Sequence, residues 1–179
     1  MASSDLRVGC YAPDFELPGI DGAVHHLRQY LMRFQGVGVV FLSYDCALVL
    51  PALQHLMAIQ QEFLPSGFTL IGIDANTEPQ PLSDRLDAMA TFARQQNLSF
   101  PYVRDETQEV AEAFGATHSP EVFLIDQSGM ISYSGSVWGH TGETEQPFLR
   151  EAIAALLQGH APAIHYTPSY GCPLQWRAR

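Results

Sequence analysis

Cys46 is the residue in this sequence with the clearest potential for chemistry. It follows an apolar run at residues 37–42 and precedes a segment with helical spacing of apolar residues, 47–64. A cysteine at a strand-to-helix turn lies near unpaired backbone N–H groups and the positive end of the helix dipole, and both favour the nucleophilic thiolate. We therefore predict a redox thiol at this position. The alternative is a small buried apolar side chain, which free cysteine often is.

The residues around Cys46 limit what this thiol could do. The residue three positions later is Val49 and the residue three positions earlier is Ser43, so the sequence has no C-x-x-C pair here. Disulfide exchange within one short motif is therefore excluded. The seven histidines show no spacing typical of a metal site, and neither a metal nor an organic cofactor is expected.

Composition narrows the class of protein. The chain has 179 residues, enough for one domain, and a net charge of −10, which argues against binding to nucleic acid or to an anionic membrane surface. No apolar stretch reaches membrane-spanning length, and residues 1–7 lack the apolar core of a secretory signal. Three cysteines in such a chain suggest a reducing compartment, so we expect a cytoplasmic protein.

The elements that must position Cys46 alternate along the chain. Two buried strands, a short extended segment and a hairpin are predicted at 37–43, 68–73, 99–104, and 121–125 with 131–134. Helices are predicted at 24–34, 47–64, 84–96, 105–115 and 146–157, with a polar loop at 139–146. This order indicates an α/β domain at 1–158. Residues 159–179, rich in proline and aromatic residues, are predicted to form an extended tail packed on that domain.

Several short motifs resemble those of the thioredoxin superfamily. These are Ala-Pro-Asp-Phe at 12–15, the Cys46 turn, Ser119-Pro120 before a hairpin strand, and Asp126-x-x-Gly129. The closer resemblance is to the peroxiredoxin-like branch (alkyl hydroperoxide reductase/thiol-specific antioxidant, or redoxin). Segment 105–124 and the closing Gly-Cys-Pro-Leu-Gln-Trp at 171–176 are similar to small bacterial members of this branch. The resemblance covers roughly residues 8–178. It implies a thioredoxin fold, a central mixed β-sheet flanked by helices, with a peroxiredoxin-like N-terminal extension and an extended C-terminal tail.

The resemblance also assigns roles around the thiol. Ser43 stands at the hydroxyl position of the peroxidase motif P-x-x-x-[TS]-x-x-C, which implies a hydrogen bond to the substrate oxygen or to the thiolate. Pro120 matches a cis proline that faces the thiol, and Ser119 before it leaves its backbone available to a substrate strand. His118, two residues before Pro120, could reach the thiol. The proline of the peroxidase motif is replaced by Val39.

The chain also departs from the pattern of the small bacterial members. Their reactive His-Cys-Pro reads Asp45-Cys46-Ala47 here, and the lysine of their closing Gly-Cys-x-x-Lys-Trp is Gln175. A carboxylate beside Cys46 disfavours the thiolate unless it points outward as a helix cap. Peroxiredoxins also use an arginine on a later strand. By alignment, the position of this arginine falls on Pro120, the thioredoxin-type proline.

The other two cysteines have different expected roles. The resemblance implies that Cys172 is a resolving thiol that forms a disulfide with Cys46 after oxidation. The alternative is a tail cysteine without a partner. Cys10 is expected to be structural, or else a second-choice partner for Cys46. Trp176 is expected to pin the tail.

We therefore predict thiol-dependent redox chemistry by the catalytic residues Cys46, Cys172 and Ser43, with Pro120, Ser119 and His118 forming the pocket. The substrate is a peroxide or a protein disulfide, and electrons come from a thioredoxin- or glutathione-type reductant. An alternative is a redox-inactive protein-binding module that keeps a peptide-accepting groove beside Pro120.

Overall fold

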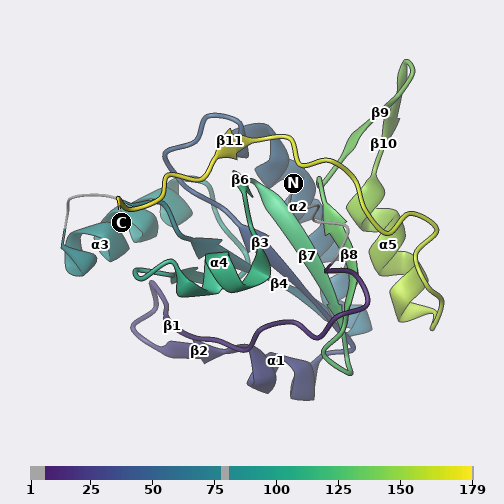
Figure 1. Cartoon of the computed structure of the whole chain (residues 1–179), viewed down its shortest axis with the longest axis horizontal. Helices are drawn as coiled ribbons and strands as arrows, with labels where there is room; N and C mark the ends of the chain where they lie inside the picture. The colour runs from purple at the N-terminus through teal and green to yellow at the C-terminus, as the bar shows by residue number, and fades with distance from the viewer. Residues whose placement is uncertain (1–6, 78–80, 179) are drawn as a thin grey trace.

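A five-stranded mixed sheet lies at the centre of the fold (Figure 1). The structure, a computed structural model, describes residues 7–77 and 81–178. The strand order is β5-β4-β3-β7-β8. The bounds are β3 Gly36–Phe41, β4 Phe68–Asp74, β5 Tyr102–Arg104, β7 Glu121–Asp126 and β8 Ile131–Gly135. β3 pairs in parallel with β4 and antiparallel with β7, which confirms the mixed α/β plan and the predicted hairpin.

The central strand β3 is fully buried because its two faces serve two separate apolar cores. Val40 and the following Leu42 face one core, and Val39 and Phe41 face the other. Both faces of β3 are therefore covered by apolar side chains, and the loop that carries Cys46 follows directly after this strand.

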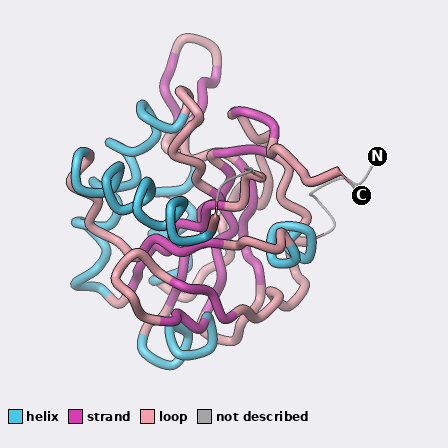
Figure 2. The backbone as a smooth tube through the Cα atoms, turned by 90° about the vertical axis from the view of Figure 1, so that its left-hand side faces the viewer, coloured by secondary structure: helices cyan, strands magenta, loops and turns pink. Residues whose placement is uncertain are grey.

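Helices cover both faces of the sheet (Figure 2). Residues of α2 (Val49–Phe63), α3 (Leu82–Gln95) and α5 (Phe148–Leu157) pack in the core that includes Val40. Residues of α1 (Leu27–Arg33) and α4 (Glu109–Phe114) pack in the core that includes Val39. α2 begins later than predicted because residues 44–48 form two consecutive turns, so Cys46 lies in the turn region before the helix and not directly before its first residue.

Two predicted segments have a different structure. Residues 24–34 do not form one helix, because β2 (Val24–His26) first pairs with β1 (Glu16–Pro18) in a hairpin. The predicted polar loop at 139–146 is a second hairpin, β9 (Gly139–Thr141) with β10 (Thr144–Gln146), which projects from the body in Figure 1. Three-residue strands are too short to show an alternating apolar pattern, so sequence periodicity does not reveal them.

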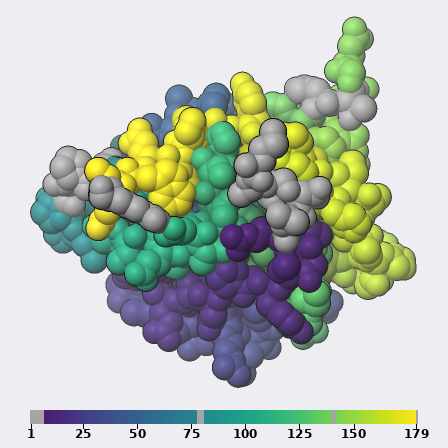
Figure 3. Space-filling view, in the orientation of Figure 1, coloured from purple at the N-terminus to yellow at the C-terminus, as the bar shows by residue number. Residues whose placement is uncertain are grey.

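The tail crosses the surface as predicted, in an extended conformation (yellow in Figures 1 and 3). Its strand β11 (Cys172–Pro173) pairs antiparallel with β6 (His118–Ser119). Leu174 is buried in the same core as Val39, whereas Trp176 is 44% exposed. The prediction that Trp176 pins the tail is therefore wrong, and Leu174 supplies the buried apolar contact of this stretch. No helix among the described residues has the length and hydrophobicity to cross a membrane.

Candidate active site

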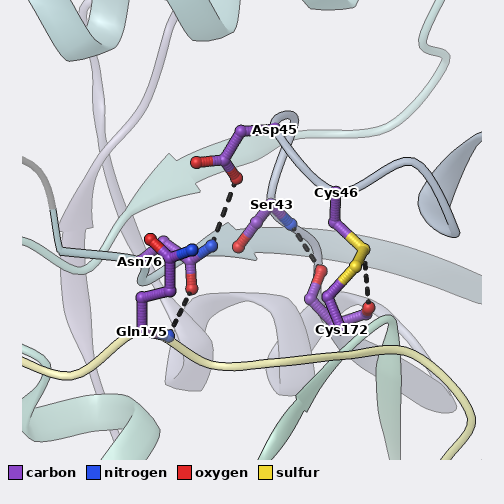
Figure 4. Close-up of a disulfide and its surroundings, with 7 residues drawn as sticks. Ser43, Asp45, Cys46, Asn76, Cys172 and Gln175 are labelled. Carbon is purple, nitrogen blue, oxygen red and sulfur yellow. Dashed lines mark hydrogen bonds between the residues drawn. A yellow bond between two sulfur atoms is a disulfide. The ribbon is translucent and has the colours of Figure 1, made fainter.

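Cys46 and Cys172 form a disulfide with an S–S distance of 2.00 Å and a Cα–Cα distance of 6.1 Å (Figure 4). This confirms the pairing that the resemblance implied. The turn that carries Cys46 is held by its own backbone, because Cys46 N–H donates to Ser43 O at 3.2 Å and Val49 N–H donates to Cys46 O at 3.1 Å. Cys46 is 5% exposed, so this end of the disulfide is nearly buried.

Strand pairing places Cys172 at this position. In the β11–β6 ladder Cys172 lies opposite Ser119 and Pro173 lies opposite His118. The Ser119 carbonyl oxygen is 3.3 Å from Cys46 Sγ. The Ser119–Pro120 peptide bond is cis, as predicted. The backbone edge before Pro120, expected to receive a substrate strand, is therefore occupied by the chain's own tail.

Ser43 lies beside the disulfide without bonding to it. Its backbone N–H donates to Ser119 Oγ at 2.7 Å. Its own hydroxyl is fully buried and has no hydrogen-bond partner within residues 7–77 and 81–178. Figure 4 shows the Ser43 hydroxyl on the side away from the sulfurs. In the disulfide state Ser43 therefore contributes through its backbone, and the expected role of its hydroxyl stays a prediction.

Asp45 points away from the disulfide (Figure 4). Its Oδ1 accepts a hydrogen bond from Asn76 Nδ2 at 3.1 Å, and its Oδ2 lies 3.7 Å from Arg85 Nη2. It does not cap α2, whose N-cap is Leu48. The carboxylate expected to oppose a Cys46 thiolate is instead directed toward an amide and a guanidinium.

Arg85 belongs to a buried charge network behind this loop. Its Nε and Nη2 donate to the two carboxylate oxygens of Asp74 at 2.7 and 3.0 Å, and its guanidinium lies 4.2 Å from the Tyr44 ring centre. Arg104 Nη1 is 3.3 Å from the same carboxylate. Burial raises the pKa of Asp74, and the hydrogen bonds and charges of the two arginines oppose that rise. Sequence reasoning missed this network because its members share no motif spacing.

The residues before Pro120 are held by Glu121. Its Oε2 accepts from the backbone N–H groups of Thr117 at 2.7 Å and His118 at 3.3 Å, and its Oε1 accepts from Ser169 Oγ of the tail at 2.8 Å. His118 Nδ1 is bonded to Thr117 Oγ1 at 2.8 Å. The described contacts of His118 do not include Cys46, so its expected reach to the thiol is not seen in this state. Glu121 was not singled out from the sequence.

Cys10 is exposed and lies outside the disulfide. Its backbone N–H donates to Arg7 O at 3.1 Å and its carbonyl accepts from Ile131 N–H at 2.9 Å, joining the N-terminal segment to β8. Cys46 is bonded to Cys172, so the second-choice pairing of Cys10 with Cys46 is not seen, and the structural role of Cys10 stays a prediction.

Comparisons with known proteins identify the family of the chain. The family model of the AhpC/TSA family matches residues 8–134. The chain belongs to this family. A thiol-disulfide oxidoreductase ResA from Geobacillus thermodenitrificans is 31% identical, over 70% of this chain and 67% of the relative. Peroxiredoxin Bcp from Escherichia coli is 26% identical, over 72% of this chain and 84% of the relative.

A solved structure of similar shape extends the likeness over nearly the whole chain. A hypothetical protein from Sinorhizobium meliloti has a TM-score of 0.85 and 27% identity, and the match covers 96% of both chains. The peroxidoxin BcpB structure from Mycobacterium tuberculosis, at 21% identity and a TM-score of 0.63, supports the thioredoxin-like fold alone. The predicted fold is confirmed, and the chain is a thiol-dependent redox protein of the AhpC/TSA family with a disulfide between Cys46 and Cys172.

Proposed function

We propose that this protein is an oxidoreductase in which Cys46 is the attacking thiol and Cys172 is the resolving thiol. The observation that carries the proposal is the Cys46–Cys172 bond, which joins the turn after β3 to the tail strand β11. The two cysteines are far apart in the sequence, and the folded tail brings them together. Such a pair is suited to reversible formation of one disulfide.

With a peroxide as substrate, the reaction has two steps. The Cys46 thiolate attacks one oxygen of ROOH, the O–O bond breaks, and Cys46 sulfenic acid and ROH are formed after one proton is taken up. The Cys172 thiol then attacks the sulfenic sulfur, which releases water and leaves the disulfide. The peroxide has been reduced by two electrons and the cysteine pair has been oxidised by two.

With a disulfide RSSR as substrate, the same pair reacts by exchange. Cys46 thiolate attacks one sulfur, forms the mixed disulfide and releases one RS⁻; Cys172 then attacks Cys46 Sγ and releases the second. In both cases a dithiol of the thioredoxin type, or two thiols of the glutathione type, reduces the Cys46–Cys172 bond. A much faster reaction with peroxide than with disulfides would support an antioxidant role.

Three neighbours of the sulfurs have proposed roles in these steps. The buried Ser43 hydroxyl has no partner among the described residues, which supports its turning to donate to the substrate oxygen or to the thiolate. Pro120 and Ser119 form the wall beside Cys46, supported by the 3.3 Å contact between Ser119 O and Cys46 Sγ. His118 borders the same wall.

The alternative of a redox-inactive binding module is less favoured. Such a module needs an open backbone edge at Ser119, and in this structure β11 pairs with that edge.

Peptide mapping under non-reducing conditions tests the proposal. The fully reduced protein receives one equivalent of hydrogen peroxide or of a small disulfide, and the remaining thiols are alkylated. We expect a Cys46–Cys172 peptide from the wild type and, in Cys46→Ser, only the slow consumption of oxidant by the remaining thiols of Cys10 and Cys172. Cys172→Ser is expected to keep the first step and to accumulate sulfenic acid or the mixed disulfide. An untouched Cys46 thiol with both oxidants would overturn the proposal.

A further inference from the structure

Asn76, a buried residue after β4, contacts the tail segment that follows Cys172. It is 3% exposed, and its Oδ1 accepts a hydrogen bond from the backbone N–H of Gln175 at 2.9 Å (Figure 4). The neighbouring Thr77 N–H donates to Gln175 O at 2.8 Å. The N–H and the carbonyl of Gln175 are therefore both hydrogen-bonded to the segment that follows β4.

A second buried carboxamide, Gln108, contacts the same segment from the N-terminal end of α4. It is 5% exposed; its Nε2 donates to Ala75 O at 2.7 Å and to Gln175 O at 2.8 Å, and its Oε1 accepts from Arg177 N–H at 2.9 Å. Bonds to the carbonyl of one residue and the N–H of the residue two positions later are what one residue of a parallel strand makes. The Gln108 carboxamide thus takes the place of a neighbouring strand.

These contacts bind the backbone of the tail rather than its side chains. Gln175, Trp176 and Arg177 all have exposed side chains, and only Leu174 is buried in this stretch. The glutamine that stands where similar proteins close with lysine therefore leaves these bonds intact. What the two carboxamides determine is the position of the tail.

We propose that Asn76 and Gln108 are positioning residues that hold residues 175–177 and thereby present Cys172 to Cys46. This inference rests on the proposed function, in which Cys172 resolves Cys46. A tethered thiol reacts according to its effective concentration at the target, and a tail fixed three residues beyond Cys172 samples far fewer positions than a loose one. Asn76 also donates to Asp45, so one carboxamide links the loop of the first cysteine to the segment of the second.

The rival explanation is that other contacts suffice to place the tail. These contacts include the two-residue β11–β6 ladder, the buried Leu174 with its N–H bonded to Thr117 O, and the hydrogen bond of Ser169 to Glu121. Thr167 and Pro168 earlier in the tail are also bonded to Ser134, Ser136 and Tyr133. In that case, removing the carboxamides changes overall stability but not the chemistry of Cys172. Only a measurement on the cysteine pair itself separates the two explanations.

The experiment compares Asn76→Ala and Gln108→Met with Gln60→Met. Gln60 is a matched control because it is also 3% exposed and binds backbone through its carboxamide, accepting from Leu70 N–H at 2.8 Å, but it joins α2 to β4. Each protein is equilibrated in glutathione redox buffers, and the fraction of Cys46–Cys172 disulfide is measured. Rapid mixing with peroxide then separates sulfenic acid formation from disulfide formation.

We expect Asn76→Ala and Gln108→Met each to lower the equilibrium constant and the rate of disulfide formation roughly tenfold, the effect of about one net buried hydrogen bond. Sulfenic acid formation by Gln108→Met should stay within about twofold of wild type, since the tail takes no part in that step. Asn76→Ala also removes a hydrogen bond to Asp45 beside Cys46, so it is judged on the equilibrium constant of the disulfide and on the step that follows sulfenic acid formation. Gln60→Met should lower resistance to urea and leave both disulfide constants unchanged.

A substitution in the tail tests the same contact without changing the buried residues Asn76 and Gln108, whose replacement could disturb folding of the domain. Gln175→Pro deletes the N–H that Asn76 accepts and leaves both carboxamides in place. Trp176→Pro is its control, since the backbone N–H of Trp176 has no hydrogen bond among the described residues. Gln175→Pro should slow disulfide formation and Trp176→Pro should do so much less.

Wild-type disulfide constants in Asn76→Ala, Gln108→Met and Gln175→Pro would overturn the inference. The proposed function fails differently, through a wild-type Cys46 that reacts with neither oxidant. The equilibrium measurement in glutathione buffers needs no peroxide, so it still tests the positioning of Cys172 in that case.

Discussion

Cys172 lies directly opposite Ser119 in the β11–β6 ladder, so the tail cysteine is aligned with the residue before the cis proline by backbone pairing. The carbonyl of Ser119 touches Cys46 Sγ, and its hydroxyl accepts from the N–H of Ser43. Ser119 is therefore the point at which the loop of one cysteine and the strand of the other meet. Changes that disturb this pairing should affect the disulfide more than they affect the rest of the fold.

Gly171→Ala is expected to slow formation of the disulfide. A Cβ at residue 171 would overlap Ser119 O and lie 2.6 Å from Ser119 C, and backbone atoms cannot give way as a flexible side chain can. The tail must then shift at the position next to Cys172. We expect a loss of roughly tenfold in the rate, comparable to a displacement that removes about one net hydrogen bond. The measurement is the time course of the Cys46–Cys172 link after one equivalent of peroxide.

The control for this change is Gly159→Ala at the start of the tail. Gly159 has a φ of +78° but a Cβ there meets no atom within 4 Å, so this variant adds backbone strain without a close contact. Equal slowing in both variants would mean that the contact with Ser119 is not the cause.

Glu121→Ala should destabilise the folded protein by about 1–3 kcal/mol, because two backbone N–H groups before Pro120 and one tail hydroxyl lose their shared acceptor. Ser169→Ala removes only the tail bond and should cost about 0.5–1.5 kcal/mol. Urea unfolding of the disulfide-bonded protein measures both. A loss in Glu121→Ala no larger than that in Ser169→Ala would contradict this account.

Arg85→Met should be among the most damaging single substitutions, at about 3–5 kcal/mol, because it leaves the buried Asp74 carboxylate with Arg104 as its remaining close cation. Arg150→Met is the matched control, since Arg150 pairs with Glu62 at the surface and is 50% exposed. A surface pair contributes about 0–1 kcal/mol. Chemical denaturation of the two variants should therefore differ severalfold, and similar losses would rule out a dominant role for the buried network.

Stability should fall in alkaline solution because of two buried phenols. Burial raises the pKa of Tyr102 well above its usual value and also raises the pKa of Tyr133. Both phenols thus stay neutral in the folded protein at a pH at which they ionise in the unfolded chain. Their contribution is complete below about pH 10 and is lost as the pH rises beyond it, by up to about 1.4 kcal/mol per pH unit for each phenol.

Tyr102→Phe tests this pH dependence. It removes one of the two phenols, so the free energy of unfolding should fall less steeply with pH, by about one proton, in urea titrations between about pH 9 and 11.5. Tyr170→Phe, which removes a phenol that is 72% exposed, is the control. An unchanged slope in Tyr102→Phe would show that Tyr102 ionises equally in both states.

The sequence predicted the parts of the site that depend on local pattern. Cys46 follows an apolar strand, Pro120 precedes a hairpin strand, and Cys172 closes the chain within a motif shared with similar proteins. These features depend on neighbours in the chain, so periodicity and resemblance identify them. The backbone then brings the cysteines together, as the resemblance implied.

The contacts that place the tail could not be predicted in the same way. Asn76 and Gln108 bind backbone groups of residues 175–177, and backbone recognition leaves no mark on the side chains that are recognised. The sequence also does not show which apolar residue of the tail is buried: Leu174 packs in the core that includes Val39, whereas Trp176 is exposed. Such choices are set by tertiary packing, which a single sequence does not display.

The Cys46–Cys172 bond joins positions that are 126 residues apart. When it is closed, everything from α2 to β11 belongs to one covalent ring. A single proteolytic cut in the extended stretch at 160–170 opens that ring but releases no fragment. The same cut in the reduced chain detaches the piece that carries Cys172. The oxidation state of the protein therefore decides whether a nick in its surface tail is harmless or removes its second cysteine.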